Sequence, residues 1–153
     1  MVWPTQVLET WWCKWDNVTQ TFQDCPADDA PTVSGMIVLF EKLLSLPLEL
    51  STPAQRDAWA AFSTILPTLP VAASEQSASI PVIAPGRNLP AKTHNSEGPA
   101  LYATHPHRQY TMGRHVASAQ NISLANDTVT YGVWGWVNNE GWEAGNTALT
   151  RRR

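Results

Sequence analysis

Apolar residues recur with the period of an α-helix in several parts of the chain. In residues 1–15, Pro4 and Thr5 give a helix-start signal, and the apolar positions then follow one helix face. The same period returns after Thr32, which can cap a helix, and it continues until Pro47 stops it. These patterns predict two amphipathic helices, with apolar faces formed by Val7, Leu8, Trp11, Trp12 and Trp15 and by Val33, Met36, Ile37, Phe40, Leu43 and Leu44.

A further helix is predicted to begin at Thr52-Pro53-Ala54-Gln55. This segment has the capping-box pattern, in which Thr and Gln side chains satisfy each other's backbone N–H groups, with proline in the first turn. The apolar period that follows ends before Pro67. Because only a short connection separates this helix from the preceding one, we expect a helical hairpin over residues 29–70.

The rest of the chain has weaker periodicity. Residues 16–31 are polar and predict a loop, while residues 66–90 contain five prolines and predict extended chain with one short strand at 80–83. Residues 114–125 predict another helix, and the glycine-rich residues 131–149 predict a loop followed by the start of a last helix. The expected fold is therefore mainly α, with long loops between the helices.

Composition narrows the class of protein. A length of 153 residues with 43% hydrophobic content suits one globular domain, and the net charge of −3 disfavours nucleic acid and anionic membranes as partners. No apolar run approaches the roughly 18 residues of a membrane span, and no signal peptide is visible. Three Asn-x-Ser/Thr sequons would suit a secreted protein, so localisation stays open. Cys13 and Cys25 can form one disulfide or remain two free thiols.

Residues 93–113, THNSEGPALYATHPHRQYTMG, concentrate side chains that donate, accept or titrate. They include three of the four histidines of the chain, one glutamate, one arginine and two tyrosines. Burying such groups is costly unless each has a partner. The stretch is therefore predicted to bind a ligand, and the alternative interpretation is a structural hydrogen-bond network.

A metal site is a second interpretation of the same stretch. His105 and His107 flank a proline, and His94 and Glu97 lie nearby in sequence, so three or four zinc-type ligands are present. Their spacing fits no standard zinc pattern, and prolines explain the neighbourhood equally well. No metal and no other cofactor is predicted.

Several motifs together resemble the six-hairpin glycosidase superfamily, in particular the family 95 alpha-L-fucosidases among the glycoside hydrolases. Residues 93–113 look like that family's His-Asn-x-Glu-x-Pro-x-Leu-Tyr-x-x-His-Pro-x-Arg-x-Tyr block. The opening segment 3–11 resembles the one that carries an acidic residue in these enzymes, and the hairpin and the closing segment 138–142 match in order and approximate spacing. The likeness covers most of the chain.

The resemblance implies a mainly α fold that is part of an (α/α)6 toroid, with catalytic residues on loops at one end. In such enzymes a general acid protonates the departing glycosidic oxygen, while a second carboxylate activates a water molecule. Glu9 falls where the acid of the family lies. The resemblance further places seven residues in contact with the carbohydrate substrate: His94, Asn95, Glu97, His105, Arg108, Glu140 and Trp142.

The chain also departs from the family pattern. The paired asparagines, the base aspartate and the N-terminal β-sandwich domain of the family have no counterpart here. Residues 1–153 are therefore expected to form one partial catalytic domain, inactive alone and completed by N- and C-terminal segments of a longer protein. The alternative function is a non-catalytic carbohydrate-binding or truncated product.

For each candidate residue a structural role is the competing interpretation. Glu9 can be a helix-surface carboxylate, His94 and His105 can be hydrogen-bonded structural residues, and Arg108 can pair with Glu97.

Overall fold

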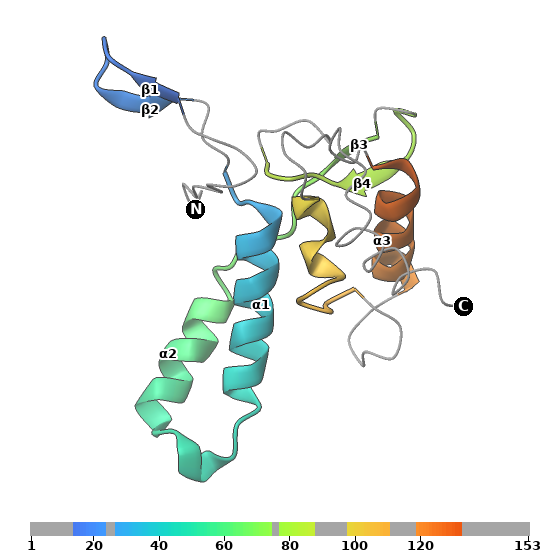
Figure 1. Ribbon diagram of the computed structural model, residues 1–153. Helices are drawn as coiled ribbons and strands as arrows, with labels where there is room; N and C mark the ends of the chain where they lie inside the picture. The colour runs from blue at the N-terminus through green and yellow to red at the C-terminus, as the bar shows by residue number, and fades with distance from the viewer. Residues whose placement is uncertain (1–13, 24–26, 75–76, 88–97, 111–118, 133–153) are drawn as a thin grey trace.

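The computed structural model describes residues 14–23, 27–74, 77–87, 98–110 and 119–132, and it is mainly helical (Figure 1). The helices and short 3-10 helices are α1 (Ala30–Leu44), η1 (Leu48–Leu50), α2 (Pro53–Ser63), η2 (Pro99–Ala103) and α3 (Ala119–Tyr131). Two small antiparallel strand pairs accompany them, β1 (Lys14–Asp16) with β2 (Thr21–Gln23), and β3 (Val71–Ala73) with β4 (Pro81–Ile83). The mainly α class predicted from the sequence is confirmed for these residues.

Helix α1 begins three residues earlier than the sequence pattern predicted. Asp29 is its N-cap, and the Asp29 carboxylate accepts a hydrogen bond of 2.9 Å from the backbone N–H of Thr32. The prediction that Thr32 caps this helix was therefore wrong. Pro31 lies in the first turn of α1, where its missing N–H would have had no helical partner.

Helices α1 and α2 form the predicted antiparallel hairpin, which extends away from the rest of the structure (Figure 1). The capping box at its second helix is confirmed, since Thr52 Oγ1 accepts from the N–H of Gln55 and Gln55 Oε1 accepts from the N–H of Thr52. Phe40 and Phe62 stack between the two helices with ring centroids 5.0 Å apart. The ring planes are 23° apart, and stacked rings at this centroid distance attract each other.

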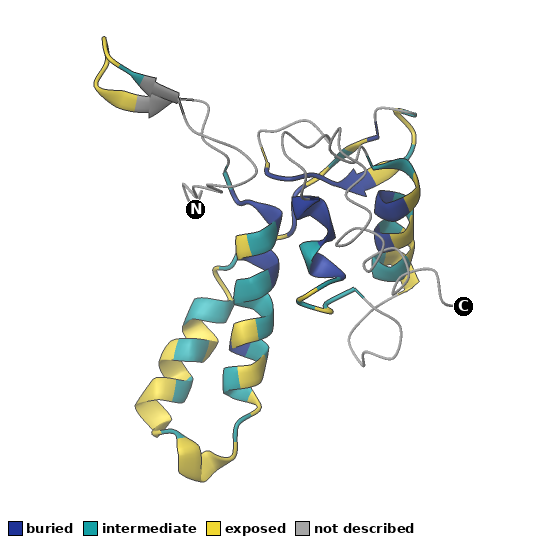
Figure 2. Cartoon of the chain, in the orientation of Figure 1, coloured by how far each residue is buried: buried dark blue, intermediate teal, exposed yellow. Residues whose placement is uncertain are grey.

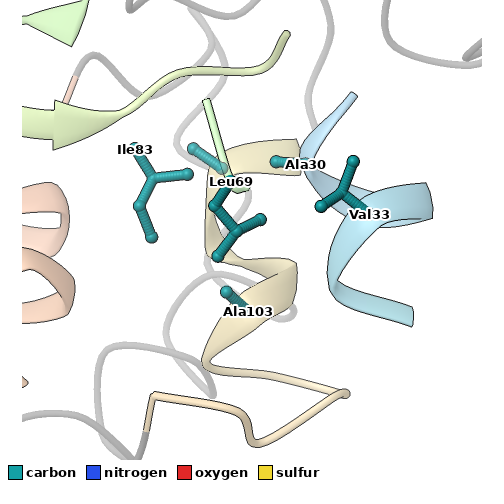
Figure 3. Close-up of a cluster of buried hydrophobic side chains, with 6 residues drawn as sticks. Ala30, Val33, Leu69, Ile83 and Ala103 are labelled. Atoms are coloured by element: carbon teal, nitrogen blue, oxygen red, sulfur yellow. The ribbon is translucent and has the colours of Figure 1, made fainter. Parts of the chain in front are cut away.

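The core lies at the other end of α1, where the helix meets η2 and β4 (Figure 3). Both α1 and η2 contribute alanines to this core: Ala30 from α1, and Ala100 and Ala103 from η2. Around them pack larger aliphatic side chains, which remove apolar surface from water. The buried cluster consists of Ala30, Val33, Leu69, Ile83, Ala100 and Ala103, with Ile37, Tyr110 and Leu124 packed against it.

Helix α3 packs against β4. Its buried residues are Ala125, Thr128 and Val129, and the hydroxyl of Thr128 accepts a 2.9 Å hydrogen bond from the N–H of Ile83. The sequence predicted a helix at 114–125. Residues 119–125 are helical and α3 continues to Tyr131, while residues 114–118 lie outside the described part of the chain. The predicted strand at 80–83 is confirmed as β4, but its partner β3 was expected only as extended chain.

The first strand pair corrects two further predictions. Lys14–Asp16 is a strand, so the helix predicted over residues 1–15 is wrong at its last two positions, and residues 1–13 lie outside the described residues. The predicted loop at 16–31 contains β2 and a tight turn. In that turn Asp16 Oδ1 accepts hydrogen bonds from the N–H groups of Val18 and Thr19, which lower the pKa of the Asp16 carboxyl.

No helix in the described ranges combines the length and the apolar character that crossing a membrane requires. The described part of the chain contains one helical hairpin, formed by α1 and α2.

Candidate functional site

The polar stretch predicted to bind a ligand is described over residues 98–110. It begins with η2, whose buried residues are Pro99, Ala100, Leu101 and Ala103. The following segment, Thr104–Tyr110, turns back over η2 and is hereafter called the histidine loop. Within it lie His105, His107 and Arg108.

Backbone hydrogen bonds hold the histidine loop against η2. The N–H groups of Gln109 and Tyr110 both donate to the carbonyl of Ala103, at 2.7 and 2.9 Å. The N–H of His107 donates to the carbonyl of Tyr102 at 3.1 Å. Buried backbone polar groups need such partners, so these bonds fix the course of the loop.

Arg108 is exposed, and its φ angle is 54°. This left-handed backbone region costs an L-residue about 1 kcal/mol, so it persists only where the surrounding structure requires it. The backbone N–H groups of Gln109 and Tyr110, which follow Arg108, both donate to Ala103, and these two hydrogen bonds hold Arg108 in the left-handed conformation. The result is a guanidinium group carried at the tip of a fixed loop.

His107 is half-buried and directed toward α1. Its Nδ1 lies 2.6 Å from the hydroxyl oxygen of Ser34, a fully buried residue of the first turns of α1. The edge of the His107 ring meets the Tyr102 ring, with centroids 5.7 Å apart and an angle of 65° between the planes. Burial of the imidazole lowers the pKa of His107, because a charged ring loses hydration there.

Tyr110 closes the loop against the core. It packs on the buried cluster at the start of α1, and burial raises the pKa of its phenol. The side-chain oxygen of Gln109 is enclosed and has no hydrogen-bond partner among the described residues. The histidine loop is thus anchored at Tyr110 and His107 and carries the exposed Arg108 between them.

Two of the predicted site residues, His105 and Arg108, lie in this loop. His105 is half-buried, and its N–H donates to the carbonyl of Leu101 at 2.9 Å. The other predicted residues lie outside the described part of the chain: Glu9, His94, Asn95, Glu97, Glu140 and Trp142. Their roles remain predictions.

Two residues of the site, Ser34 and His107, were not predicted to contact a carbohydrate. His107 was considered only as a metal ligand, and Ser34 was part of a helix read for its apolar positions. A signal was present, because Ser34 occupies a position on the face of α1 that also carries Ala30 and Ile37. A serine on such a face indicates a buried hydroxyl that needs partners.

The side chains of residues 98–110 are suited to hydrogen bonding with a ligand. It offers imidazole and guanidinium groups, while residues 98–110 contain no carboxylate to serve as general acid or base. Within the described ranges, no three His, Cys, Asp or Glu side chains are grouped so that they could hold a metal ion. The histidine loop therefore suits recognition of a hydroxylated or anionic ligand.

Comparisons with models of protein families, with curated proteins and with solved structures found no match for this chain.

Proposed function

We propose that the chain is the carbohydrate-binding part of a glycoside hydrolase of the six-hairpin type. The observation that carries this proposal is the packing of the histidine loop and η2 on the helical hairpin, through the start of α1. In a toroid of helical hairpins, substrate-binding loops lie at one end of the helices. The histidine loop contacts α1 at Ser34 through His107, in the half of the helix that lies away from the tip of the hairpin at η1 (Figure 1).

Arg108 and the two histidines provide what a polyhydroxylated ligand requires. Binding sites for such ligands combine a few placed polar groups with apolar or aromatic surface. Arg108 offers several donors, and imidazole nitrogens accept or donate according to their tautomer. Tyr102 beside His107 adds an aromatic ring to the same surface.

In this proposal Glu9 is the general acid, and the ring of helices is completed by segments outside this chain. Glycoside hydrolysis needs two carboxyl groups, one on each side of the scissile bond. The second carboxylate is expected in the longer protein. The chain alone is then a binding unit without turnover.

Sugar binding is tested by titrating the ¹⁵N-labelled 153-residue chain with L-fucose, D-galactose, D-glucose and L-rhamnose. We expect saturable shifts for at least one sugar at the amides of His105, His107 and Arg108. As a matched control, the amides of Ala58 and Ala61 on the exposed α2 helix should not shift. The absence of saturable shifts with all four sugars would refute the proposal.

The catalytic part is tested by Glu9→Gln in a longer protein that contains this chain. Loss of an acid should slow hydrolysis of glycosides with poor leaving groups by about 10²-fold or more, and affect activated aryl glycosides much less. Equal turnover on both substrate types would remove Glu9 from the acid role. Sugar binding by a longer protein that hydrolyses none of these glycosides would favour the non-catalytic alternative.

A further inference from the structure

The hydroxyl group of Ser34 is surrounded by three potential partners. Its oxygen lies 2.6 Å from the carbonyl oxygen of Ala30, 3.2 Å from that of Pro31 and 2.6 Å from Nδ1 of His107. A hydroxyl has one proton to donate and lone pairs to accept. Where this proton goes decides which nitrogen of His107 carries a hydrogen.

The short distance to Ala30 places the proton. Two oxygens at 2.6 Å are at hydrogen-bond distance only if a hydrogen lies between them, because otherwise their lone pairs would repel. A carbonyl oxygen has no proton, so Ser34 must donate to Ala30. The lone pair of Ser34 then accepts, and Nδ1 of His107 must be the donor.

The structure around the ring holds His107 in this orientation. Gly35 leaves room for the ring, since a Cβ at that position would lie 3.1 Å from Cε1 and 3.3 Å from Nε2 of His107. Tyr102 contacts the ring from another side. A Cβ at position 35 would therefore require the imidazole to shift by a few tenths of an ångström.

The second ring nitrogen remains available. Nε2 of His107 forms no hydrogen bond with a residue in the described ranges, and it is not among their fully enclosed polar atoms that lack partners. In a neutral imidazole that carries its proton on Nδ1, Nε2 is an acceptor. Burial favours this neutral form, because it lowers the pKa of His107.

We propose that Ser34 is a positioning residue that fixes His107 in the Nδ1–H tautomer, so that Nε2 accepts a hydrogen bond from a hydroxyl group of a bound carbohydrate. This inference rests on the proposed function for the identity of the ligand, but not for the tautomer. Arg108, one residue further along the loop, is exposed, and its guanidinium group carries several donors. Together they match a sugar, in which each hydroxyl can donate to one group and accept from another.

The tautomer is tested first, in the 153-residue chain without ligand. A two-bond ¹H–¹⁵N spectrum at pH 7.5 should show His107 with a protonated Nδ1 and an unprotonated Nε2. In Ser34→Ala the acceptor for Nδ1–H is gone, and we expect His107 to change toward the Nε2–H form, which free histidine prefers. Amide shifts of α3, which lies apart from Ser34, report whether the variant is folded.

The ligand is tested with the sugar that gives the largest shifts in the titration described above. We expect its addition to shift Nε2 of His107. His107→Asn keeps a donor near the Nδ1 position but has no acceptor at the position of Nε2, so its affinity should fall about 3- to 10-fold, the value of one neutral hydrogen bond. His107→Gln, whose amide oxygen reaches the Nε2 position, should lose less.

The outcomes separate the two proposals. An Nε2–H tautomer in the wild-type chain, or an unchanged tautomer in folded Ser34→Ala, would overturn the positioning role of Ser34. Sugar binding that leaves Nε2 and the affinity of His107→Asn unchanged would overturn the role of His107 but retain the proposed function. An Nδ1–H tautomer with no binding of any sugar would uphold the positioning role and defeat the proposed function.

Discussion

Single side chains in this structure join segments that are distant in sequence by binding backbone carbonyls. Arg56 of α2 is an example, because its guanidinium donates to the carbonyls of Leu44, Leu46 and Pro47 where α1 ends. The last carbonyls of a helix have no partner within the helix and carry partial negative charge. Arg56 therefore supplies hydrogen-bond donors to the carbonyl groups at the end of α1, and its positive charge offsets their partial negative charge.

Replacing Arg56 with Met should lower the free energy of unfolding by about 1–2 kcal/mol, because the charged hydrogen bonds are lost while the apolar stem remains. Chemical denaturation would measure the loss. Lys42→Met is the matched control, since Lys42 is an exposed cation near the same helix end. If both variants lose the same stability, the charge of Arg56 matters and its hydrogen bonds do not.

A second residue-scale prediction concerns pH. The pKa of His107 is lower in the folded chain than the ordinary value of 6.5, so the unfolded chain binds more protons as the pH falls. The stability that the neutral ring contributes is present above pH 6.5 and is lost as the pH falls through the folded pKa. Denaturation of wild type and His107→Gln at pH 7.5 and pH 5 should show a smaller loss of stability on acidification in the variant. Equal losses would contradict this assignment.

At the scale of elements, the start of α2 is fixed by its capping box. Thr52→Ala should lower the free energy of unfolding by about 1 kcal/mol, because the N–H of Gln55 loses its acceptor. The neighbouring Ser51→Ala is the control. The hydroxyl of Ser51 is enclosed without a hydrogen-bond partner in the described part of the chain, so its removal should be neutral or slightly stabilising. Thermal or chemical denaturation would distinguish the two.

The contact between β4 and α3 gives another element-scale prediction. In Thr128→Val the buried N–H of Ile83 loses its acceptor, and the expected cost is about 1–3 kcal/mol. Thr128→Ser removes a buried methyl group but keeps the hydroxyl, so it should retain slow hydrogen exchange at the Ile83 amide. Fast exchange of that amide in both variants would show that the methyl group, and not the hydroxyl, protects it.

Elements with strong local signals could be predicted from the sequence, and those determined by tertiary contacts could not. The capping box at Thr52 is local, and α2 begins where it predicts. The predicted end before Pro67 was wrong, because α2 ends at Ser63. The end of α3 is not local, since residues 126–128 read Asn-Asp-Thr and are weak helix formers. They are helical because Thr128 and its neighbours pack against β4. Pairing of β1 with β2 likewise depends on a partner strand.

In the candidate site, too, local features could be predicted from the sequence and tertiary contacts could not. The composition of residues 93–113 indicated which stretch is polar, and two of its predicted site residues, His105 and Arg108, lie in the described histidine loop. The Ser34–His107 contact could not be predicted, because it joins residues 73 positions apart. The number of residues between Ser34 and His107 does not indicate how close the two side chains lie in space.

At the scale of the whole molecule, burial is unevenly distributed (Figure 2). The buried residues gather at the start of α1, η2, β4 and α3, whereas α2 has no buried residue. Large apolar side chains are exposed on the hairpin, including Leu48 at 75% and Leu50 at 64%. Local stability should follow this distribution, because elements with little buried surface open at a lower free energy.

Hydrogen exchange measures this gradient. Amides in the middle of α2 should exchange at least about tenfold faster than those of α1 near Ser34, a difference of roughly 1.4 kcal/mol in opening free energy. Amides near Leu43, in the last turn of α1, serve as an internal reference and should resemble α2. Uniform protection along both helices would mean that the hairpin opens only with the whole structure.

The bond between Thr128 and Ile83 also affects how copies of this chain meet. A short sheet normally presents an outer row of N–H and C=O groups to which a strand of another molecule can add, and such addition starts aggregation. Here the outward N–H of Ile83 is already occupied by a side chain of α3. Helix α3 therefore covers the edge strand β4 at Ile83. A strand of another molecule cannot form a hydrogen bond with this N–H group unless it displaces Thr128.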